Sequence, residues 1–252
     1  MRIGFIGAGS MARALALGIG EPAVFSSGTG KRARVLAGEA GGTAVESNAE
    51  LAGSVDVVFL CHKPKQLDEV AAAVVDSAQA IVSVLAATPL ATLEARFPNR
   101  PVYRIMAGIP AEVGRGVITW TEGSRAAEGP AAELRELLGR CGTVVDVDES
   151  LVEPAMALTG CGPAFFADFA EALADAGERH GLSRPQALAL VTETMAATAA
   201  YLAANELDAP SLRHRVATPG GVTEQGLRRL DQKGLSRAVD AAVDLVVEAA
   251  RP

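Results

Sequence analysis

A glycine-rich turn near the amino terminus is the first segment whose residue types could do chemistry. The run Gly-Ala-Gly-Ser-Met-Ala at positions 7–12 follows a short apolar run and precedes a helical pattern. Gly7 allows a tight turn, Gly9 lets the backbone approach a pyrophosphate, and the helix start supplies free N–H groups. Because strand, turn and helix occur in this order, a dinucleotide-phosphate site is favoured over an unrelated glycine turn. Its expected members are Gly7, Ala8, Gly9, Ser10 and Met11.

The end of the second expected strand bears on which dinucleotide binds. An NAD site places Asp or Glu here for the ribose hydroxyls. This chain has Ser-Ser-Gly-Thr-Gly-Lys-Arg at positions 26–32, where no carboxylate repels a 2′-phosphate and hydroxyls, N–H groups and cations can hold one. NADPH is therefore the expected cofactor, with NADH as the alternative, and its expected ligands are Ser26, Ser27, Lys31 and Arg32. Either cation taken alone is equally well interpreted as a solvated helix residue.

Cys61 and His62, which follow the expected strand Val55–Leu60, invite a metal or nucleophile hypothesis. Adjacent strand residues point to opposite faces, however, and no partner ligands are visible in the sequence. The three cysteines, with Cys141 and Cys161, form no CxxC pair, so neither a zinc site nor a disulfide framework is expected. We therefore predict no metal, and reduced thiols favour a cytoplasmic protein.

A second candidate site is the run Thr-Pro-Gly-Gly-Val-Thr at positions 218–223. Pro-Gly-Gly breaks one element, and a helix is expected to restart near Val222. Two glycines before a helix start offer N–H groups suited to a carboxylate, and Thr223 adds a hydroxyl. Physical reasoning alone leaves a second interpretation open, in which this is an ordinary loop between two helices and Thr223 is the N-cap.

The elements that must position these residues change character near Ser150. Before it, β-branched runs alternate with helical patterns, which predicts a parallel sheet covered on both faces. After it, strand signal is almost absent and Ala, Leu and Glu form long helical patterns. The expected strands are 2–6, 23–26, 55–60, 81–85, 102–105, 117–120 and 144–147, and the expected helices are about 11–19, 31–38, 64–76, 130–139, 165–180, 184–205 and 236–250.

This change predicts an α/β fold with two domains. Residues 1–148 are expected to form an NADP-binding, Rossmann-type doubly wound parallel sheet, and residues 149–252 an all-helical dimerisation and substrate domain. Alanine-rich helices cover their apolar faces best against another copy of themselves, so a homodimer is expected.

Composition excludes several classes of protein. Of the 252 residues 49% are hydrophobic and 21% charged, a globular profile. The net charge of −7, without a basic block, disfavours nucleic-acid binding. The chain enters a folded motif directly after Met1, so no signal peptide is expected. No apolar stretch reaches ~18 residues without polar interruption, so no membrane span is expected.

Several motifs, in chain order, resemble those of the pyrroline-5-carboxylate reductase family. Thr218–Thr223 resembles the family's Ser-Pro-Gly-Gly-x-Thr, and Thr159–Ala164 resembles its Ser-Gly-Ser-Gly-Pro-Ala. Lys63-Pro64 matches a Lys-Pro that the family carries at a strand end, and Asn48 matches an Asn that contacts the cofactor. The similarity covers essentially the whole chain.

The resemblance implies that NADPH delivers a hydride to the C=N carbon of 1-pyrroline-5-carboxylate, a small cyclic imine acid, giving L-proline in proline biosynthesis. It places the Thr223 hydroxyl at the ring nitrogen, which makes Thr223 the catalytic residue. Because an iminium is already electrophilic, the protein mainly aligns donor and acceptor and manages one proton. A homodimer through interwoven C-terminal helices is implied, with a ring of dimers as a larger assembly. The implied substrate-binding residues are Val216, Gly220, Gly221, Val222 and Thr223, and the further cofactor-binding residues are Asn48, Cys61, Lys63, Pro64 and Ala86.

Two departures from the family lie where the reactive end of the cofactor is expected. The family's Met-Pro-Asn-Thr-Pro reads Met-Ala-Gly-Ile-Pro here, so that Gly108 replaces an Asn. The family's Ala-Ala-Gly reads Leu85-Ala86-Ala87. Gly108 is expected to free volume for a larger or differently substituted ring, which keeps open a paralogous cyclic-imine reductase of secondary metabolism.

Two other functions compete with imine reduction. A β-hydroxyacid dehydrogenase of similar layout would need a catalytic Lys on a helix of the second domain, where Lys233, close after the Pro-Gly-Gly loop, is the only lysine. This position disfavours it. A non-catalytic dinucleotide-binding protein would fit the loss of Asn at Gly108, whereas the intact Pro-Gly-Gly-x-Thr run argues against it.

Overall fold

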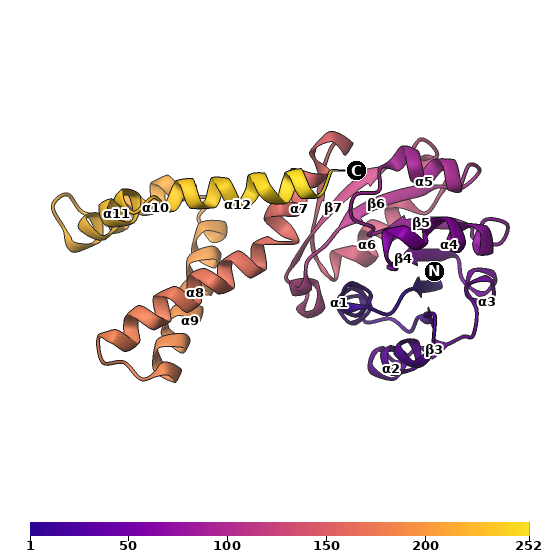
Figure 1. The fold of residues 1–252 in the computed structure, drawn as a ribbon, viewed down its shortest axis with the longest axis horizontal. Helices are drawn as coiled ribbons and strands as arrows, with labels where there is room; N and C mark the ends of the chain where they lie inside the picture. The colour runs from indigo at the N-terminus through magenta and orange to yellow at the C-terminus, as the bar shows by residue number, and fades with distance from the viewer. Residues whose placement is uncertain (252) are drawn as a thin grey trace. The chain divides into compact units, whose positions relative to one another are not determined.

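The computed structural model describes residues 1–251 of the chain and divides them into two compact units. One unit comprises Met1–Pro163 with the described residues from Val246 onward, and the other comprises Ala164–Leu245 (Figure 1). The first contains the whole sheet and the second is entirely helical. The boundary expected from the sequence, between residues 148 and 149, stays a prediction.

The sheet has eight strands in the order β3-β2-β1-β4-β5-β6-β7-β8. Every neighbouring pair is parallel except β6 and β7. The connection between these two strands, from Met106 to Gly116, is too short for the crossover that parallel pairing needs, so they pair antiparallel. The strands are β1 (Ile3–Ile6), β2 (Val24–Ser26), β3 (Thr43–Ala44), β4 (Val57–Leu60), β5 (Ala80–Ser83), β6 (Val102–Met106), β7 (Gly116–Glu122) and β8 (Gly142–Asp146).

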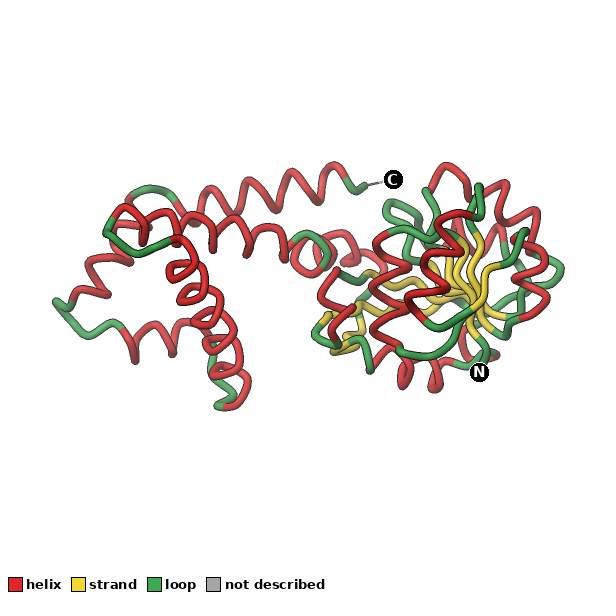
Figure 2. The backbone as a smooth tube through the Cα atoms, turned by 90° about the horizontal axis from the view of Figure 1, so that it is seen from below, coloured by secondary structure: helices red, strands yellow, loops and turns green. Residues whose placement is uncertain are grey.

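Helices cover both faces of this sheet, as Figure 2 shows, which confirms the doubly wound prediction. The side chains of alternate strand residues pack into two separate hydrophobic cores. One core joins Phe5 and Phe59 to α1, α2 and α6, and the other joins Leu60 and Ile81 to α3, α4 and α5. The helices are α1 (Ser10–Ile19), α2 (Lys31–Ala40), α3 (Asn48–Ser54), α4 (Leu67–Val74), α5 (Leu90–Arg96) and α6 (Ala131–Gly139), with short 3₁₀ turns η1 (Pro64–Gln66), η2 (Ile109–Val113), η3 (Ala126–Glu128) and η4 (Glu149–Leu151).

Several short elements, among them β3, α3 and α5, are not visible in the sequence pattern. β3 has two residues, and α3 and α5 have seven each. A helix of seven residues presents barely two turns, too few for its apolar periodicity to stand out. The N-cap of α3 is nevertheless visible afterwards in the sequence, since Ser47 accepts a hydrogen bond from the Glu50 N–H.

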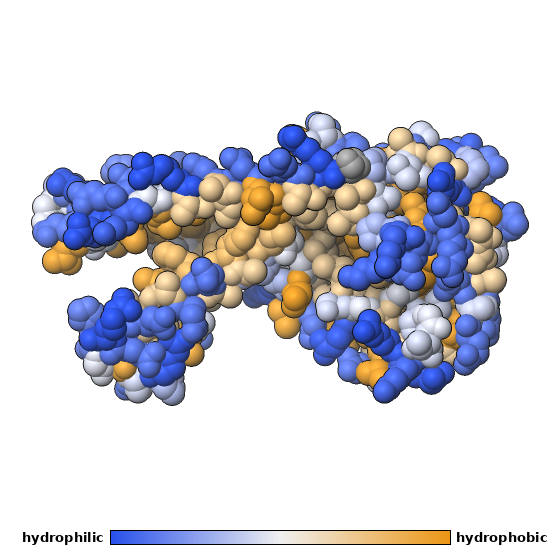
Figure 3. Space-filling model, in the orientation of Figure 1, coloured by the Kyte–Doolittle hydropathy of each residue, from blue (hydrophilic) through white to orange (hydrophobic). Residues whose placement is uncertain are grey.

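The helical unit has almost no core of its own. Among its described residues, the buried apolar side chains are the alanines Ala170, Ala174 and Ala187, while Phe166 is 63% and Leu190 57% exposed. Figure 3 shows apolar surface running over α8 and α12. The helices of the second half are α7 (Val152–Thr159), α8 (Gly162–Arg179), α9 (Arg184–Ala204), α10 (Ala209–Val216), α11 (Val222–Gln232) and α12 (Leu235–Ala249). Such a surface needs a covering partner.

By length and composition alone, α9 is a candidate membrane span. The sequence predicts no membrane span, because no apolar stretch reaches ~18 residues without polar interruption, and one such helix among the described residues is weak evidence against that prediction. A Glu near the middle of a spanning helix would be costly in hydrocarbon, so the exposed apolar surface of α9 is better explained by a protein partner.

Candidate functional site

The glycine turn after β1 has the geometry that phosphate binding requires. Gly7 has a φ of +97°, and a Cβ at this position would lie 2.5 Å from the Cys61 carbonyl oxygen, so only glycine fits. Gly9 is the N-cap of α1 and has open space where a side chain would be. Ala12 is fully buried, as close helix–strand packing demands. The first N–H groups of α1 are therefore open to an anion.

The remaining predicted members of this turn lie around the same helix start. Ser10 is the first residue of α1 and is exposed, while Ala8 and Met11 are half-buried beside the core. No acidic residue occupies the first turn of α1, and no side chain caps it. The turn is tied to the neighbouring strand, because the Gly7 N–H donates to the Ser26 carbonyl oxygen at 2.9 Å.

The residues from Ser26 to Arg32 differ in their exposure to solvent. Ser26 is 2% exposed, and its hydroxyl donates to Oδ1 of Asn48 at 2.7 Å. Ser26 thus orients the Asn48 side chain, which lies at the start of α3. Lys31 and Arg32 are exposed in the first turn of α2. Their role as ligands of a 2′-phosphate at the end of β2 stays a prediction.

Arg34 is a further cation at this loop that sequence reasoning missed. Its guanidinium lies over Gly30, the N-cap of α2, and is 3.5 Å from the Glu46 carboxylate. The pair is exposed, so it is weak and the guanidinium can turn to another anion. The sequence could have indicated this contact, because Arg34 is four positions after Gly30 and residues four apart share one face of a helix.

We expect Ser27→Asp to shift cofactor preference toward NADH. The Ser27 hydroxyl accepts the Ala33 N–H at 3.2 Å, and a carboxylate can keep that contact while it repels a 2′-phosphate. The ratio of kcat/KM with NADPH to that with NADH should fall at least about tenfold. Ser27→Asn is the matched neutral control, and an equal shift in both variants would contradict the electrostatic explanation.

The end of β4 meets the glycine turn through its backbone. The Cys61 N–H donates to the Ile6 carbonyl oxygen at 2.8 Å. Burial raises the pKa of the Cys61 thiol, so it stays protonated and is no nucleophile. Lys63 and Pro64 are exposed, and Pro64 begins η1. Cys61, Lys63 and Pro64 therefore line the same end of the sheet as Gly7.

His62 is held as a neutral ring. Its Nδ1–H donates to the Lys63 carbonyl oxygen at 2.9 Å, and Nε2 is buried without a partner among the described residues. Burial lowers the pKa of His62, which opposes protonation. Within residues 1–251, no three His, Cys, Asp or Glu side chains are grouped so as to hold a metal ion.

The loop after β5 is strained. Ala87 has a φ of +51°, in the left-handed region that costs a residue with a Cβ roughly 1–2 kcal/mol. Ala86 is exposed beside it, and the Thr88 hydroxyl donates to the Ala86 carbonyl oxygen at 3.0 Å. Ala87 stands where the resemblance has glycine, so this chain keeps the backbone conformation without the residue that relaxes it.

The expected free volume at Gly108 is not present. Gly108 is buried, and a Cβ built on it would lie 2.6 Å from the Thr159 carbonyl oxygen. The Pro163 ring is also close, at 3.6 Å from the same point. The backbone of the Thr159–Pro163 segment therefore fills the space beside residue 108, and the inference that this substitution enlarges the ring pocket is wrong.

The Pro-Gly-Gly loop of the helical unit uses some of its own N–H groups. The Gly220 N–H donates to the Glu224 carboxylate at 2.7 Å, and the Gly221 N–H donates to the Thr218 carbonyl oxygen at 2.9 Å. The hydrogen bond from the Gly220 N–H lowers the pKa of Glu224, and the hydrogen bond from Arg228 lowers it further. Sequence reasoning missed Glu224, although its spacing of four from Gly220 was visible.

The start of α11 shows which residue is the N-cap of this helix. Gly221 is the N-cap, no side chain caps the helix, and Thr223 is its exposed second residue. The interpretation of Thr223 as N-cap is therefore wrong. The N–H groups of Val222 and Thr223 have no acceptor within the helix. Val216, the last residue of α10, is exposed, and Val222 is 86% exposed.

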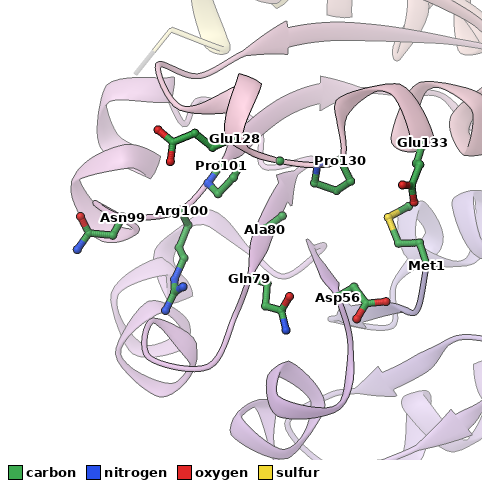
Figure 4. Close-up of a pocket in the computed structure, with 11 residues that line it drawn as sticks. Met1, Asp56, Gln79, Ala80, Asn99, Arg100, Pro101, Glu128, Pro130 and Glu133 are labelled. Carbon is green, nitrogen blue, oxygen red and sulfur yellow. The ribbon is translucent and has the colours of Figure 1, made fainter.

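A cavity of about 590 Å³ lies elsewhere on the sheet (Figure 4). Met1, Asp56 and Ala80 line it, and they mark the amino ends of β1, β4 and β5. Arg100, also in its wall, donates to the Val75 and Asp76 carbonyl oxygens at the end of α4. Ligands of open α/β sheets bind at the carboxyl ends of the strands, so this cavity is not the nucleotide site.

Comparison with known proteins is in accord with this geometry. Residues 149–252 match the sequence model described as pyrroline-5-carboxylate reductase dimerisation, and residues 2–87 match one described as NADP oxidoreductase coenzyme F420-dependent. The pyrroline-5-carboxylate reductase of Aquifex aeolicus is 31% identical, with 100% of this chain and 97% of that protein covered. The chain belongs to the pyrroline-5-carboxylate reductase family. The reductase of Pseudomonas aeruginosa is 35% identical over 96% of this chain and 93% of its own.

Solved structures of pyrroline-5-carboxylate reductases share the fold. That of Streptococcus pyogenes has a TM-score of 0.90 at 28% identity, covering 100% of this chain and 98% of its own. That of Plasmodium falciparum, solved with NADP bound, has a TM-score of 0.87 at 25% identity and covers 100% and 97%. A 3-hydroxyisobutyrate dehydrogenase of Mycobacterium tuberculosis is much less similar, with a TM-score of 0.52 at 17% identity over 73% of this chain, so the β-hydroxyacid dehydrogenase alternative is less well supported.

Proposed function

We propose that this chain is an NADPH-dependent pyrroline-5-carboxylate reductase that forms L-proline. One observation carries most of the weight. The glycine turn after β1 and the Pro-Gly-Gly loop before α11 occur in one chain that matches named reductases over its full length. The turn fits a dinucleotide, since Gly9 leaves open space at the start of α1 and no acid follows β2.

We assign the substrate carboxylate to the start of α11. The N–H groups of Val222 and Thr223 are free for an anion, whereas those of Gly220 and Gly221 are already used within the loop. The predicted roles of Gly220 and Gly221 then become conformational: Gly220 has a φ of +75°, and Gly221 is the N-cap. The positive end of the helix dipole adds to the attraction for the carboxylate.

The Thr223 hydroxyl is the group we assign to the ring nitrogen. When bound, the reduced nicotinamide supplies a hydride to the C=N carbon. Thr223 then holds the nitrogen by a hydrogen bond, which aligns the imine and stabilises the developing amine. The proposal needs no acid–base dyad, because the protonated imine is already electrophilic.

A panel of cyclic imines tests the substrate assignment. Five- and six-membered imines are compared by kcat/KM, each with and without the carboxylate. Because Gly108 leaves no extra room, we expect the five-membered acid to be reduced best. Equal rates for the acids and their decarboxylated analogues would remove the assigned role of the loop before α11.

We further infer that the chain is a homodimer built through its helical unit. The described residues of this unit bury only alanines, which is too little for a stable core. Residues 149–252 match the family's dimerisation region. A second copy would cover the apolar surface of α8, α9 and α12. A ring of dimers and a cytoplasmic location stay predictions, the latter favoured by three free cysteines among the described residues.

Light scattering at micromolar concentration should give the mass of a dimer or a multiple of it. Leu190→Arg, in the exposed middle of α9, should lower that mass, because a charge would be buried in the interface. Val145→Arg, on the edge strand β8, is the matched control and should leave the mass unchanged. A monomeric wild-type protein would contradict the inference.

A further inference from the structure

A buried ion network lies beneath the strained loop that follows β5. Arg104, on β6, is 2% exposed and pairs in register with Ser83 at the end of β5. Its guanidinium donates to Glu149 at 2.8 Å and to Glu153 at 2.7 Å. Two carboxylates thus share one buried cation, yet they differ in what else they touch.

Glu149 alone reaches the loop. The same Oε1 atom that accepts from Arg104 also accepts the Leu90 N–H at 2.8 Å, at the first residue of α5. Glu149 therefore fixes the distal end of the Leu85–Pro89 loop. The proximal end is tied by the Leu85 N–H, which donates to the Ser83 hydroxyl at 3.3 Å. Between these two ties lies Ala87, with its φ of +51°.

The network is poorly optimised for stability. Nε of Arg104 and Oε2 of Glu149 are both buried without a partner among the described residues. A half-satisfied buried network is less favourable than an apolar one of the same shape. The β5–α5 loop therefore combines a strained residue, Ala87, with a contact to an incompletely hydrogen-bonded ion network. Such costly features are usually kept in a protein where the geometry they impose is needed for function.

We propose that Glu149, held by Arg104, is a positioning residue that keeps the strained β5–α5 loop in the conformation that meets the nicotinamide end of the cofactor. The proposal rests on the proposed reductase function. The loop lies at the carboxyl end of a central parallel strand, where dinucleotides bind in this fold. Arg104 and Glu149 act through the loop and touch neither substrate nor cofactor.

Glu149→Gln and Glu153→Gln form a matched pair of tests. Each removes one charge from the same guanidinium, but only Glu149 contacts Leu90. We expect Glu149→Gln to lower kcat at least about tenfold, since small misplacements of reacting groups have effects of that size. The isotope effect with 4-deuterated NADPH should rise as hydride transfer becomes limiting, while the Kd of NADPH changes less than about threefold. Glu153→Gln should stay within about threefold in kcat.

Hydrogen exchange reports on the loop independently of activity. In the NADP⁺-bound protein, peptides spanning residues 85–90 should exchange faster in Glu149→Gln and at the wild-type rate in Glu153→Gln. If the wild-type protein does not reduce the imine, the proposed function is wrong, but the exchange rates of the two variants can still be compared. Equal exchange rates and equal kcat values in the two variants would overturn the positioning role.

A rescue variant separates positioning from stability. Glycine adopts the left-handed conformation without strain, so adding Ala87→Gly to Glu149→Gln should recover a large part of kcat. The double variant also carries the test if the single variant does not fold. If neither folds, or if Ala87→Gly recovers stability but no activity, the network serves stability alone and the proposal is overturned.

Discussion

Thr223→Ala is expected to lower kcat by roughly one to two orders of magnitude and to leave the melting temperature nearly unchanged. The structure separates these two effects. Gly221, not Thr223, is the N-cap of α11, so truncating Thr223 removes no cap. Its side chain is exposed in the single chain and packs in no core. On the proposed assignment, the variant loses only the hydrogen bond to the ring nitrogen.

The measurement for Thr223 combines steady-state kinetics with thermal unfolding. Thr223→Ser keeps the hydroxyl and should retain most of the wild-type kcat. A Thr223→Ala variant of full activity, or a loss of kcat that follows a lowered melting temperature, would contradict the catalytic assignment.

Gly108→Asn, which restores the residue common in the family, is expected to damage the protein instead of improving it. A Cβ at this position would lie 2.6 Å from the Thr159 carbonyl oxygen, and backbone atoms cannot move aside cheaply. Overpacking of this kind costs about 1–3 kcal/mol of unfolding free energy. Activity should fall as well, because the Thr159–Pro163 segment would be displaced.

Chemical denaturation of Gly108→Asn, with Ile109→Asn as the control, checks this expectation. Ile109 is 62% exposed, so the same side chain there should cost little. Unchanged stability of Gly108→Asn together with faster reduction would restore the view that this position is simply vacant.

The nucleotide turn was predictable because most of its requirements are local. A tight turn at Gly7, an open helix start at Gly9 and a small residue at position 12 occur together at a fixed spacing, although the Cys61 carbonyl oxygen that also requires glycine at position 7 lies far along the chain. The buried strands were likewise readable from continuous apolar runs. The antiparallel pairing of β6 with β7 was not predicted, although the short Met106–Gly116 connection that causes it is visible in the sequence.

The errors arose where distant residues decide the local environment. The space beside Gly108 is filled by the backbone at Thr159, far along the chain, which no local pattern reveals. The Arg104–Glu149 pair joins β6 to η4 in the same way. Glu224 is a different case, since its position one turn after Gly220 could have indicated the hydrogen bond that the loop makes to itself.

The most direct test of the account is the oxidation of NADPH by the purified protein on addition of 1-pyrroline-5-carboxylate, with the product identified by chromatography. We expect saturable oxidation that yields one L-proline for each NADPH consumed, with NADH less effective. No oxidation of NADPH above the imine-free rate, at any substrate concentration, would contradict it and favour a protein that binds the dinucleotide without catalysis.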